Sequence, residues 1–208
     1  AKHEITPMFS STPLLIGVDA GLTPAAVVGQ LSYDGRLVVY DSLISEDMGA
    51  LRFIQERLKP LLTNKFPGRS AMVIIDPAAF QRVQTDERTV ADIYRSEGFM
   101  LKPAKTNSVA ARIAAVERYM TRVVDGKYGL TLDPVHASSL IQAMAGKYRY
   151  KINTKGAKDE KPEKSHPWSD IADAFQYLCL HADGGETFGG TITDERRGVR
   201  KVASSGWT

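Results

Sequence analysis

The sequence contains little cysteine and no long apolar run. Its single cysteine, Cys179, lies in the apolar helical pattern of residues 174–180, which indicates a buried thiol and argues against disulfide or redox chemistry. No stretch is long and apolar enough to cross a bilayer, and the N-terminus lacks the charged-then-apolar pattern of a signal peptide. We therefore expect a soluble, intracellular protein.

A phosphate-binding Walker A loop is also absent, so a P-loop ATPase site is not expected in these 208 residues. The formal net charge of only +3 is too small to indicate a nucleic-acid partner by itself. The length and the 43% hydrophobic content suit one domain with a buried core. We expect an N-terminal arm or linker at 1–13, a single domain at 14–182 and a flexible, glycine-rich tail at 183–208.

Aspartates end two of the apolar runs and share one face of a predicted helix. Asp19 and Asp76 each follow a run typical of a buried strand, so each carboxylate emerges where open α/β sheets bind ligands. Asp170 and Asp173 stand three residues apart on the helix. Converging carboxylates repel each other, and a divalent cation with oxygen ligands relieves that repulsion. The pattern predicts a Mg²⁺ or Mn²⁺ site for phosphoryl chemistry.

Each carboxylate also has a purely structural interpretation. Asp19 and Asp76 could each initiate a turn, and Asp170 could stabilise the first turn of its helix. Asp173 is harder to explain in this way, because it lies inside the helix among apolar neighbours, where an unpaired charge is costly. The coincidence of all four at strand ends and on one helix face favours a functional site.

The order of the predicted elements indicates the fold class. Strands are predicted at residues 14–20, 25–33, 37–43, 71–76, 99–103 and 128–132. Helices are predicted at residues 49–62, 89–97, 137–145 and 169–181, together with one that begins after Ser108. The turn Asp34-Gly35 joins the second and third strands, and helical crossovers lead to the later ones. This is the RNase H-like α/β arrangement: a central mixed sheet with three antiparallel strands followed by parallel strands, and helices on both faces.

Two of these helices carry predicted apolar stripes that pack on the core. The stripe of the first helix is Leu51, Ile54, Leu58 and Leu61. The stripe of the helix after Ser108 is Val109, Ile113, Val116 and Met120. Arg112 falls outside this second stripe.

Candidate phosphate contacts occur in two places. One group surrounds the end of a strand and the start of a helix: Lys102, Lys105, Asn107 and Arg112. The other group belongs to the basic segment 147–164, which begins as one arm of a hairpin: Lys155, Lys158 and Lys161. Simple surface charges and a solvated loop are the alternatives. His166 is either an auxiliary proton shuttle or weak ligand, or an ordinary loop residue.

Four short motifs occur in a specific order along the chain. They are Gly17-Val18-Asp19-Ala20-Gly21, Ile74-Ile75-Asp76-Pro77-Ala78, Lys105-Thr106-Asn107 with Arg112-Ile113, and Asp170-Ile171-Ala172-Asp173-Ala174-Phe175-Gln176-Tyr177-Leu178. With them the chain resembles, over about 14–182, the C-terminal nuclease domain of the large terminase subunit of tailed bacteriophages.

The resemblance implies a metal-dependent endonuclease that cuts concatemeric viral DNA during packaging, with little sequence specificity. The implied catalytic residues are Asp19, Asp76, Asp170 and Asp173, as ligands of two Mg²⁺ or Mn²⁺ ions that activate water and stabilise the leaving 3′ oxygen. The implied partners are double-stranded DNA, an ATPase motor domain on the same full-length protein, a portal protein and a small terminase subunit, in the cytoplasm of the infected host and with no membrane.

Two other functions are consistent with parts of the sequence. The segment from Asp19 to Thr23 also fits the phosphate-binding turn of actin-like or sugar-kinase-like ATPases, although the chain lacks the length and the second glycine-rich loop of that class. The second alternative is a catalytically silent RNase H-like domain that docks DNA or a portal-like partner. The intact carboxylates argue against it.

Overall fold

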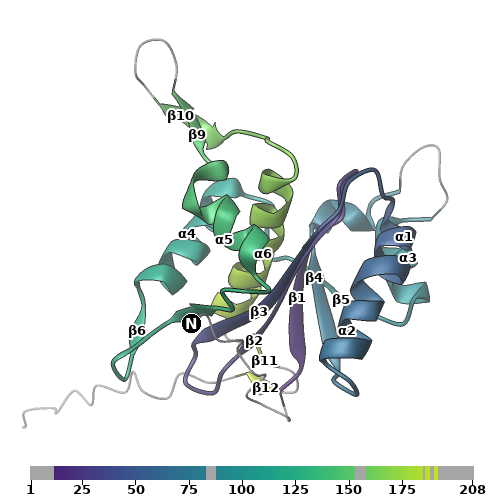
Figure 1. Cartoon of the computed structure of the whole chain (residues 1–208), viewed down its shortest axis with the longest axis horizontal. Helices are drawn as coiled ribbons and strands as arrows, with labels where there is room; N and C mark the ends of the chain where they lie inside the picture. Colours follow the sequence, from purple (N-terminus) through teal and green to yellow (C-terminus); the bar gives the residue numbers. More distant parts are fainter. Residues whose placement is uncertain (1–11, 83–87, 153–157, 185, 188–189, 192–208) are drawn as a thin grey trace, which may run out of the picture.

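A six-stranded sheet separates two helical layers in the computed structural model (Figure 1). The structure describes residues 12–82, 88–152, 158–184, 186–187 and 190–191. Nearly all of the predicted N-terminal arm, most of the predicted tail and Lys155 lie outside the described residues, as does the side chain of Lys158. The bounds 14–182 for a single domain therefore remain a prediction.

The strands of the central sheet follow the order β5-β4-β1-β2-β3-β8. Their bounds are β1 Leu14–Asp19, β2 Ala25–Leu31, β3 Leu37–Ile44, β4 Ala71–Ile75, β5 Met100–Pro103 and β8 Leu130–Leu132. The strands β1, β2 and β3 pair antiparallel, whereas β4, β5 and β8 each join a neighbour in parallel. This topology confirms the predicted RNase H-like fold class.

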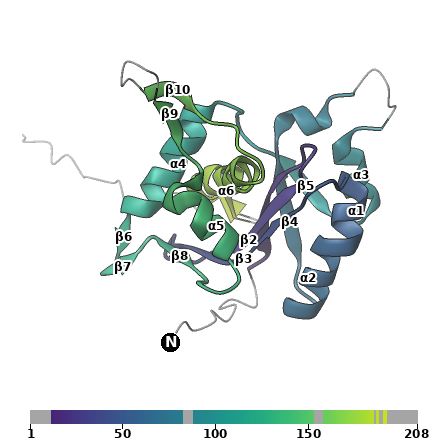
Figure 2. The same cartoon turned by 45° about the horizontal axis from the view of Figure 1, so that its top comes forward.

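The helices cover both faces of the sheet (Figure 2). One layer contains α1 Ala50–Phe53, η1 Ile54–Leu58, α2 Lys59–Lys65, η2 Pro77–Phe80 and α3 Val90–Ser96. The other contains α4 Val109–Thr121, α5 Ser138–Gln142, η3 Ala143–Lys147 and α6 Trp168–Asp183. No helix in the described part of the chain is long and apolar enough to span a membrane.

Three short hairpins complete the described chain. They are β6 Val123–Val124 with β7 Lys127–Tyr128, β9 Tyr150–Ile152 with β10 Lys158–Pro162, and β11 Glu186–Thr187 with β12 Gly190–Thr191. The β9–β10 hairpin confirms that residues 148–152 begin a hairpin, but its pairing ends at Pro162 and Glu163 rather than near His166.

The predicted apolar stripes of two helices are partly wrong. Ile54 and Leu58 are buried as predicted, but Leu51 is exposed and Phe53 is buried in its place, before the π-helix begins at Ile54. On α4 the buried residues are Arg112, Ala115, Val116 and Tyr119, whereas Met120 is exposed. The packed face of α4 is therefore rotated by about one residue from the prediction, because Arg112 and Tyr119 rather than aliphatic side chains face α6.

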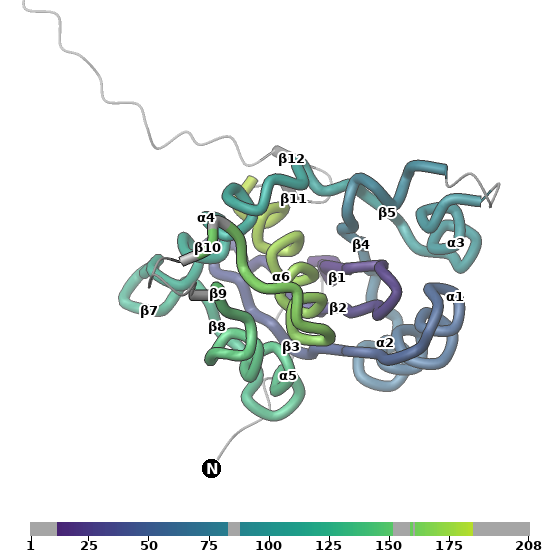
Figure 3. Tube along the Cα trace, turned by 90° about the horizontal axis from the view of Figure 1, so that it is seen from above, coloured from purple at the N-terminus to yellow at the C-terminus, as the bar shows by residue number. Residues whose placement is uncertain are grey.

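Helix α6 lies against β1 and β2, with α4 and α5 packed around it (Figures 2 and 3). All residues from Ser169 to Ala182 are buried. This explains why its sequence is apolar on nearly every face rather than amphipathic.

Gly17 permits the close contact between β1 and α6. A Cβ atom at this position would overlap the carbonyl oxygen of Ala174 and would lie 2.8 Å from the Cβ atom of Leu178. Both neighbours belong to a packed helix and cannot move independently. Since side chains alternate along a strand, Asp19 projects from the same face of β1 as Gly17, toward α6.

We predict that Gly17→Ala lowers the free energy of unfolding by about 3 kcal/mol or more, because the added methyl group must push α6 away from the sheet. Urea denaturation followed by circular dichroism measures this change. The matched control is Gly49→Ala, since no atom lies within 4 Å of a Cβ at Gly49, and we expect it to cost less than about 1 kcal/mol. Equal effects of the two substitutions would contradict the close-packing argument.

Candidate active site

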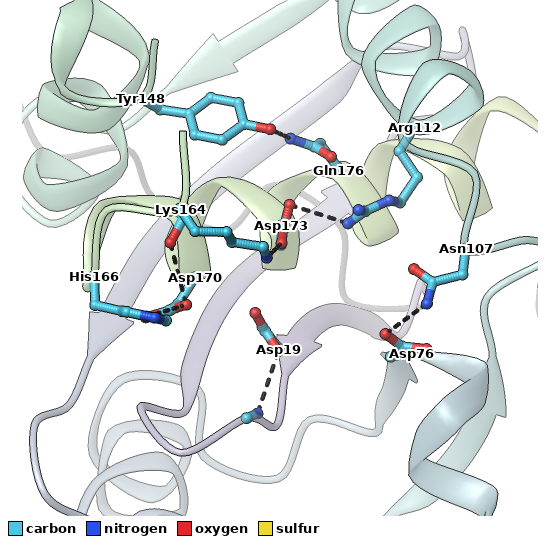
Figure 4. A network of polar contacts seen from close by, with 12 residues as sticks. Asp19, Asp76, Asn107, Arg112, Tyr148, Lys164, His166, Asp170, Asp173 and Gln176 are labelled. Carbon is cyan, nitrogen blue, oxygen red and sulfur yellow. Dashed lines mark hydrogen bonds and ion pairs between the residues drawn. The ribbon is translucent and has the colours of Figure 1, made fainter. Parts of the chain in front are cut away.

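The four predicted aspartates lie at the end of the sheet where β1 and β4 terminate (Figure 4). Val18 of β1 is paired with Ile75 of β4, so Asp19 and Asp76 leave adjacent parallel strands at the same level. Asp170 and Asp173 are in the N-terminal part of α6. The tertiary structure therefore brings three separate segments of the chain together, as the sequence predicts.

Asp19 lies beside two carboxylates of α6, Asp170 and Asp173. Burial raises the pKa of its carboxyl group to about 7, and the carboxylates of Asp173 and Asp170 add to this increase. The backbone N–H of Gly21 donates a hydrogen bond to Asp19 Oδ1 at 3.2 Å, and together with the charge of Lys164 it acts in the opposite direction. We call Asp19, Asp170 and Asp173 the acidic centre.

Two cations contact Asp173, which is buried. The ammonium group of Lys164 lies 2.6 Å from Oδ2, and the guanidinium group of Arg112 lies 3.1 Å from Oδ1. Burial alone would lower the pKa of Lys164, but its hydrogen bond to Asp173 and the charge of that carboxylate outweigh burial and raise it. Each oxygen of Asp173 therefore has a cationic partner.

Asp170 is buried and has neutral or titratable partners instead. Nδ1 of the exposed His166 lies 2.7 Å from its Oδ2, and the hydroxyl group of Thr23 donates to the same oxygen. His166 therefore contacts the acidic centre, which is consistent with the auxiliary role considered for it. Thr23 was not predicted as a neighbour of Asp170, although the segment from Asp19 to Thr23 is similar to a phosphate-binding turn.

Asp76 has a separate set of partners. It caps η2 by accepting from the backbone N–H of Ala78 at 2.7 Å, and it also accepts from the side-chain amide of Asn107 at 3.1 Å and from the hydroxyl group of Tyr177 at 2.7 Å. The turn-forming interpretation of Asp76 is therefore correct as far as its local geometry goes. Its contact with α6 through Tyr177 is what places it beside the acidic centre.

Tyr177 connects Asp76 with Asp173. Its ring lies against the guanidinium group of Arg112, at 4.7 Å from the ring centroid, and Arg112 pairs with Asp173. Burial and the hydrogen bond to Asp76 raise the pKa of Tyr177, so the phenol keeps its proton and remains a donor. Tyr177 was not predicted as a site residue, although its position four residues after Asp173 places it on the same face of the helix.

The predicted phosphate contacts are dispersed. The prediction that Arg112 contacts phosphate is wrong for this structure, because Arg112 is buried in an ion pair with Asp173. Lys105 extends to Gly184 at the far end of α6, about 16 Å along the helix axis from Asp173. Lys102 lies partly exposed on β5. Neither lysine belongs to the acidic centre.

Asn107 and Lys161 both line a groove of about 530 Å³ between α4 and the β9–β10 hairpin. Tyr150 and Glu117 line it as well. Asn107 also donates to Asp76, so one residue that lines the groove contacts a predicted site aspartate. It is therefore the part of the described surface where two of the predicted DNA-binding residues come together.

Among the residues that the structure describes, no three Asp, Glu, His or Cys side chains are close enough together to hold a metal ion. The donors of the acidic centre nevertheless suit one, since they are carboxylate oxygens, and burial together with the charges of Asp173 and Asp170 raises the pKa of Asp19. The positive charges of Lys164 and Arg112 offset part of that repulsion. The residues fit a divalent cation chemically, and their roles as ligands remain predictions.

No model of a known protein family matches the sequence, and no curated protein matches it. Among solved structures, the large terminase from a thermophilic bacteriophage is similar at a TM-score of 0.57 and 16% identity, over 86% of this chain and 42% of that one. The complex of the same terminase with ATP-gamma-S is similar at a TM-score of 0.59 and 16% identity, over 85% and 41%. The yeast mitochondrial Holliday junction resolvase Ydc2 has a TM-score of 0.46 and 11% identity, over 85% and 80%, which is too low to support an argument.

The likeness to the terminase confirms the fold expected from the sequence resemblance. At this identity it shows the fold alone. This chain spans about two fifths of the length of the terminase structures that it matches.

We predict that Asp19→Asn stabilises the metal-free protein at high pH. Unfolded Asp19 ionises near its ordinary pKa of 3.8, whereas the folded carboxyl keeps its proton until about pH 7, so stability is lost as pH rises through this window. Asparagine does not ionise, and we expect a gain of about 1–3 kcal/mol at pH 8 that vanishes near pH 4. Urea denaturation in EDTA at both pH values measures it.

The control is Asp125→Asn, which removes the same charge at an exposed turn where Asp125 has a φ of 48°, a conformation that asparagine accepts. It should show no comparable gain. If Asp19→Asn is equally stable relative to the parent at both pH values, burial and the neighbouring carboxylates do not raise the pKa of Asp19 as described.

Proposed function

We propose that this chain is a divalent-metal-dependent endonuclease that hydrolyses phosphodiester bonds of double-stranded DNA with little sequence specificity. The observation that carries the proposal is the placement of carboxylates from a strand end and a facing helix beside one another, Asp19 on β1 and Asp170 and Asp173 on α6 (Figure 4). Their mutual repulsion is costly unless a cation offsets it. The likeness of the fold to a bacteriophage large terminase supports the same proposal.

The acidic centre and Asp76 would hold two Mg²⁺ or Mn²⁺ ions. When bound, these ions lower the pKa of the attacking water and stabilise the leaving 3′ oxygen. Tyr177 and Asn107 orient Asp76 through hydrogen bonds of 2.7 and 3.1 Å. Buried Arg112 fixes one oxygen of Asp173, so that the carboxylate presents a defined edge to the site.

His166 and Thr23 orient Asp170. The imidazole Nδ1 lies 2.7 Å from Oδ2, and the hydroxyl group donates to that oxygen. Because the imidazole is exposed, it is also able to exchange a proton with solvent or substrate beside the acidic centre. This is the auxiliary role that we propose for His166.

We propose that DNA reaches the carboxylates along the groove between α4 and the β9–β10 hairpin. Lys161 and Asn107 supply phosphate contacts there, and Tyr150 supplies apolar surface. The groove offers Lys161 and Asn107 for phosphate contacts, so contacts with the DNA backbone should dominate. Binding should then depend steeply on salt and weakly on sequence.

The terminase likeness also suggests the biological setting of the reaction. We propose that residues 14–182 form the nuclease domain of a DNA-packaging protein of a tailed bacteriophage, whose full-length form carries an ATPase motor domain. In this setting it cuts concatemeric viral DNA in the cytoplasm of the infected host, beside a portal protein and a small terminase subunit. The observation in support is that the matched terminase is more than twice as long as the region shared with this chain.

A catalytically silent DNA-docking module is the second candidate. It is favoured by one observation, namely that Lys164 and Arg112 already neutralise Asp173 and no three described metal-ligand side chains form a cluster. A domain of this kind would bind DNA without cutting it. The two candidates therefore differ in a single measurable property.

We predict that the purified protein cuts plasmid DNA in Mn²⁺ or Mg²⁺ and does not cut it in Ca²⁺ or EDTA. Asp19→Asn and Asp76→Asn should each lower the rate at least about a hundredfold, since each removes a charged oxygen ligand. Asp125→Asn, at an exposed turn, should cut like the parent. Undiminished cleavage by Asp19→Asn would reject the assignment, and DNA binding without cleavage in any metal would favour the docking module.

Charge reversal at Lys161 should weaken DNA binding without reducing stability, because this side chain is exposed beside the groove. We expect the slope of log K against log salt to fall by about 1 for Lys161→Glu, as for the loss of one phosphate contact. The matched control is Lys127→Glu in the remote β6–β7 hairpin, which should leave the slope unchanged. Fluorescence anisotropy with a random-sequence duplex measures both. A sharply defined preferred site in a substrate library would count against backbone-dominated binding.

A further inference from the structure

The two cations at Asp173 differ in their freedom to leave. The side chain of Arg112 is 5% exposed and lies against the ring of Tyr177, so it cannot withdraw without disrupting the packing between α4 and α6. The side chain of Lys164 is 66% exposed and contributes little to the core. Only the Lys164 ammonium group can therefore be exchanged for another cation.

The side chain of Lys164 can move while the backbone beside it stays in place. It follows Glu163, whose backbone N–H donates to the carbonyl oxygen of Arg149 at 2.8 Å and whose side chain pairs with Lys151 at 3.1 Å. These contacts fix the base of the β9–β10 hairpin one residue before Lys164. The backbone next to Lys164 is therefore held in place, whereas its side chain is exposed to solvent where it contacts the acidic centre.

The Lys164 ammonium group lies 2.6 Å from Asp173 Oδ2, the oxygen that Arg112 leaves available. A divalent cation bound by Asp173 would compete with Lys164 for Oδ2, since the guanidinium group of Arg112 already lies against Oδ1. The two positive charges would also repel each other at such close range. Occupation by Lys164 therefore opposes the coordination of a metal ion by this oxygen.

We propose that Lys164 is a tethered counter-ion that occupies the acidic centre in the metal-free protein and is displaced when a divalent cation binds. This inference rests on the proposed function, because it assumes that the acidic centre is the metal site. It explains how buried carboxylates are accommodated without metal, and it makes the metal affinity lower than the carboxylates alone would give. Lys164 is in this sense a positioning residue rather than a catalytic one.

The first test is Mn²⁺ binding to the full, untagged chain by isothermal titration calorimetry in the absence of DNA. Lys164→Gln should bind Mn²⁺ about five to ten times more tightly than the parent, because the competing charge is removed. Lys164→Arg keeps the charge and should not gain affinity. Lys127→Gln, which removes an exposed lysine in the β6–β7 hairpin away from the acidic centre, is the matched control and should bind like the parent.

The second test uses the unmodified sequence and therefore does not depend on the folding of a variant. Lysine acetylation is followed by mass spectrometry with and without saturating Mn²⁺. Release from Asp173 should make the Lys164 amine several times more reactive, whereas the reactivity of Lys161 should not change. Unchanged labelling of Lys164 in the presence of bound Mn²⁺ would overturn the inference.

The outcomes separate this inference from the proposed function. If the parent and Lys164→Gln bind Mn²⁺ with equal affinity, the counter-ion role is wrong while the metal site stands. If neither binds Mn²⁺ at millimolar concentrations, the metal site itself is wrong and the inference falls with it. If Lys164→Gln binds Mn²⁺ more tightly than the parent and the control variants, and Mn²⁺ increases the labelling of Lys164 in the parent, both the counter-ion role and the metal site are supported.

Discussion

The contact between β1 and α6 at Gly17 is the constraint on which the rest of the structure depends. Because a hydrogen atom replaces a side chain there, the helix backbone at Ala174 rests directly on the strand. That approach buries α6 on every side and brings its first turns over the end of β1. Asp19, two residues further along the strand, consequently faces Asp170 and Asp173. Close packing thus creates the electrostatic conflict of the site.

The fold offsets this conflict with positive charges from two differently held side chains. Arg112 is held by packing on Tyr177 and serves as a permanent partner of Asp173. Lys164 approaches from solvent at the base of a hairpin. A buried ion pair contributes little net stability but is costly to break, whereas an exposed one is cheap to exchange. The arrangement therefore combines a fixed geometry with an exchangeable charge.

Much of the fold was predictable because its signals are local. Apolar runs before Asp19 and Asp76 identify two buried strands, and Asp34-Gly35 identifies the hairpin turn between β2 and β3. Helix faces were less predictable. On α4 the buried set contains Arg112 and Tyr119, whose inward orientation depends on partners in α6 that hydrophobic periodicity does not represent. On the first helix, Phe53 rather than Leu51 is buried, a difference that apolar spacing alone does not predict.

The sequence by itself determined the order of the strands and helices, the positions of the aspartates at their ends, and the mixed RNase H-like sheet, because these follow from local periodicity and chain connectivity. Only the tertiary structure decided which charges meet. It buried Arg112 at Asp173, placed Lys164 in the acidic centre and carried Lys105 to the opposite end of α6. Long charged side chains reach several ångströms from their backbone, so their partners are fixed by packing in three dimensions and not by their spacing along the chain.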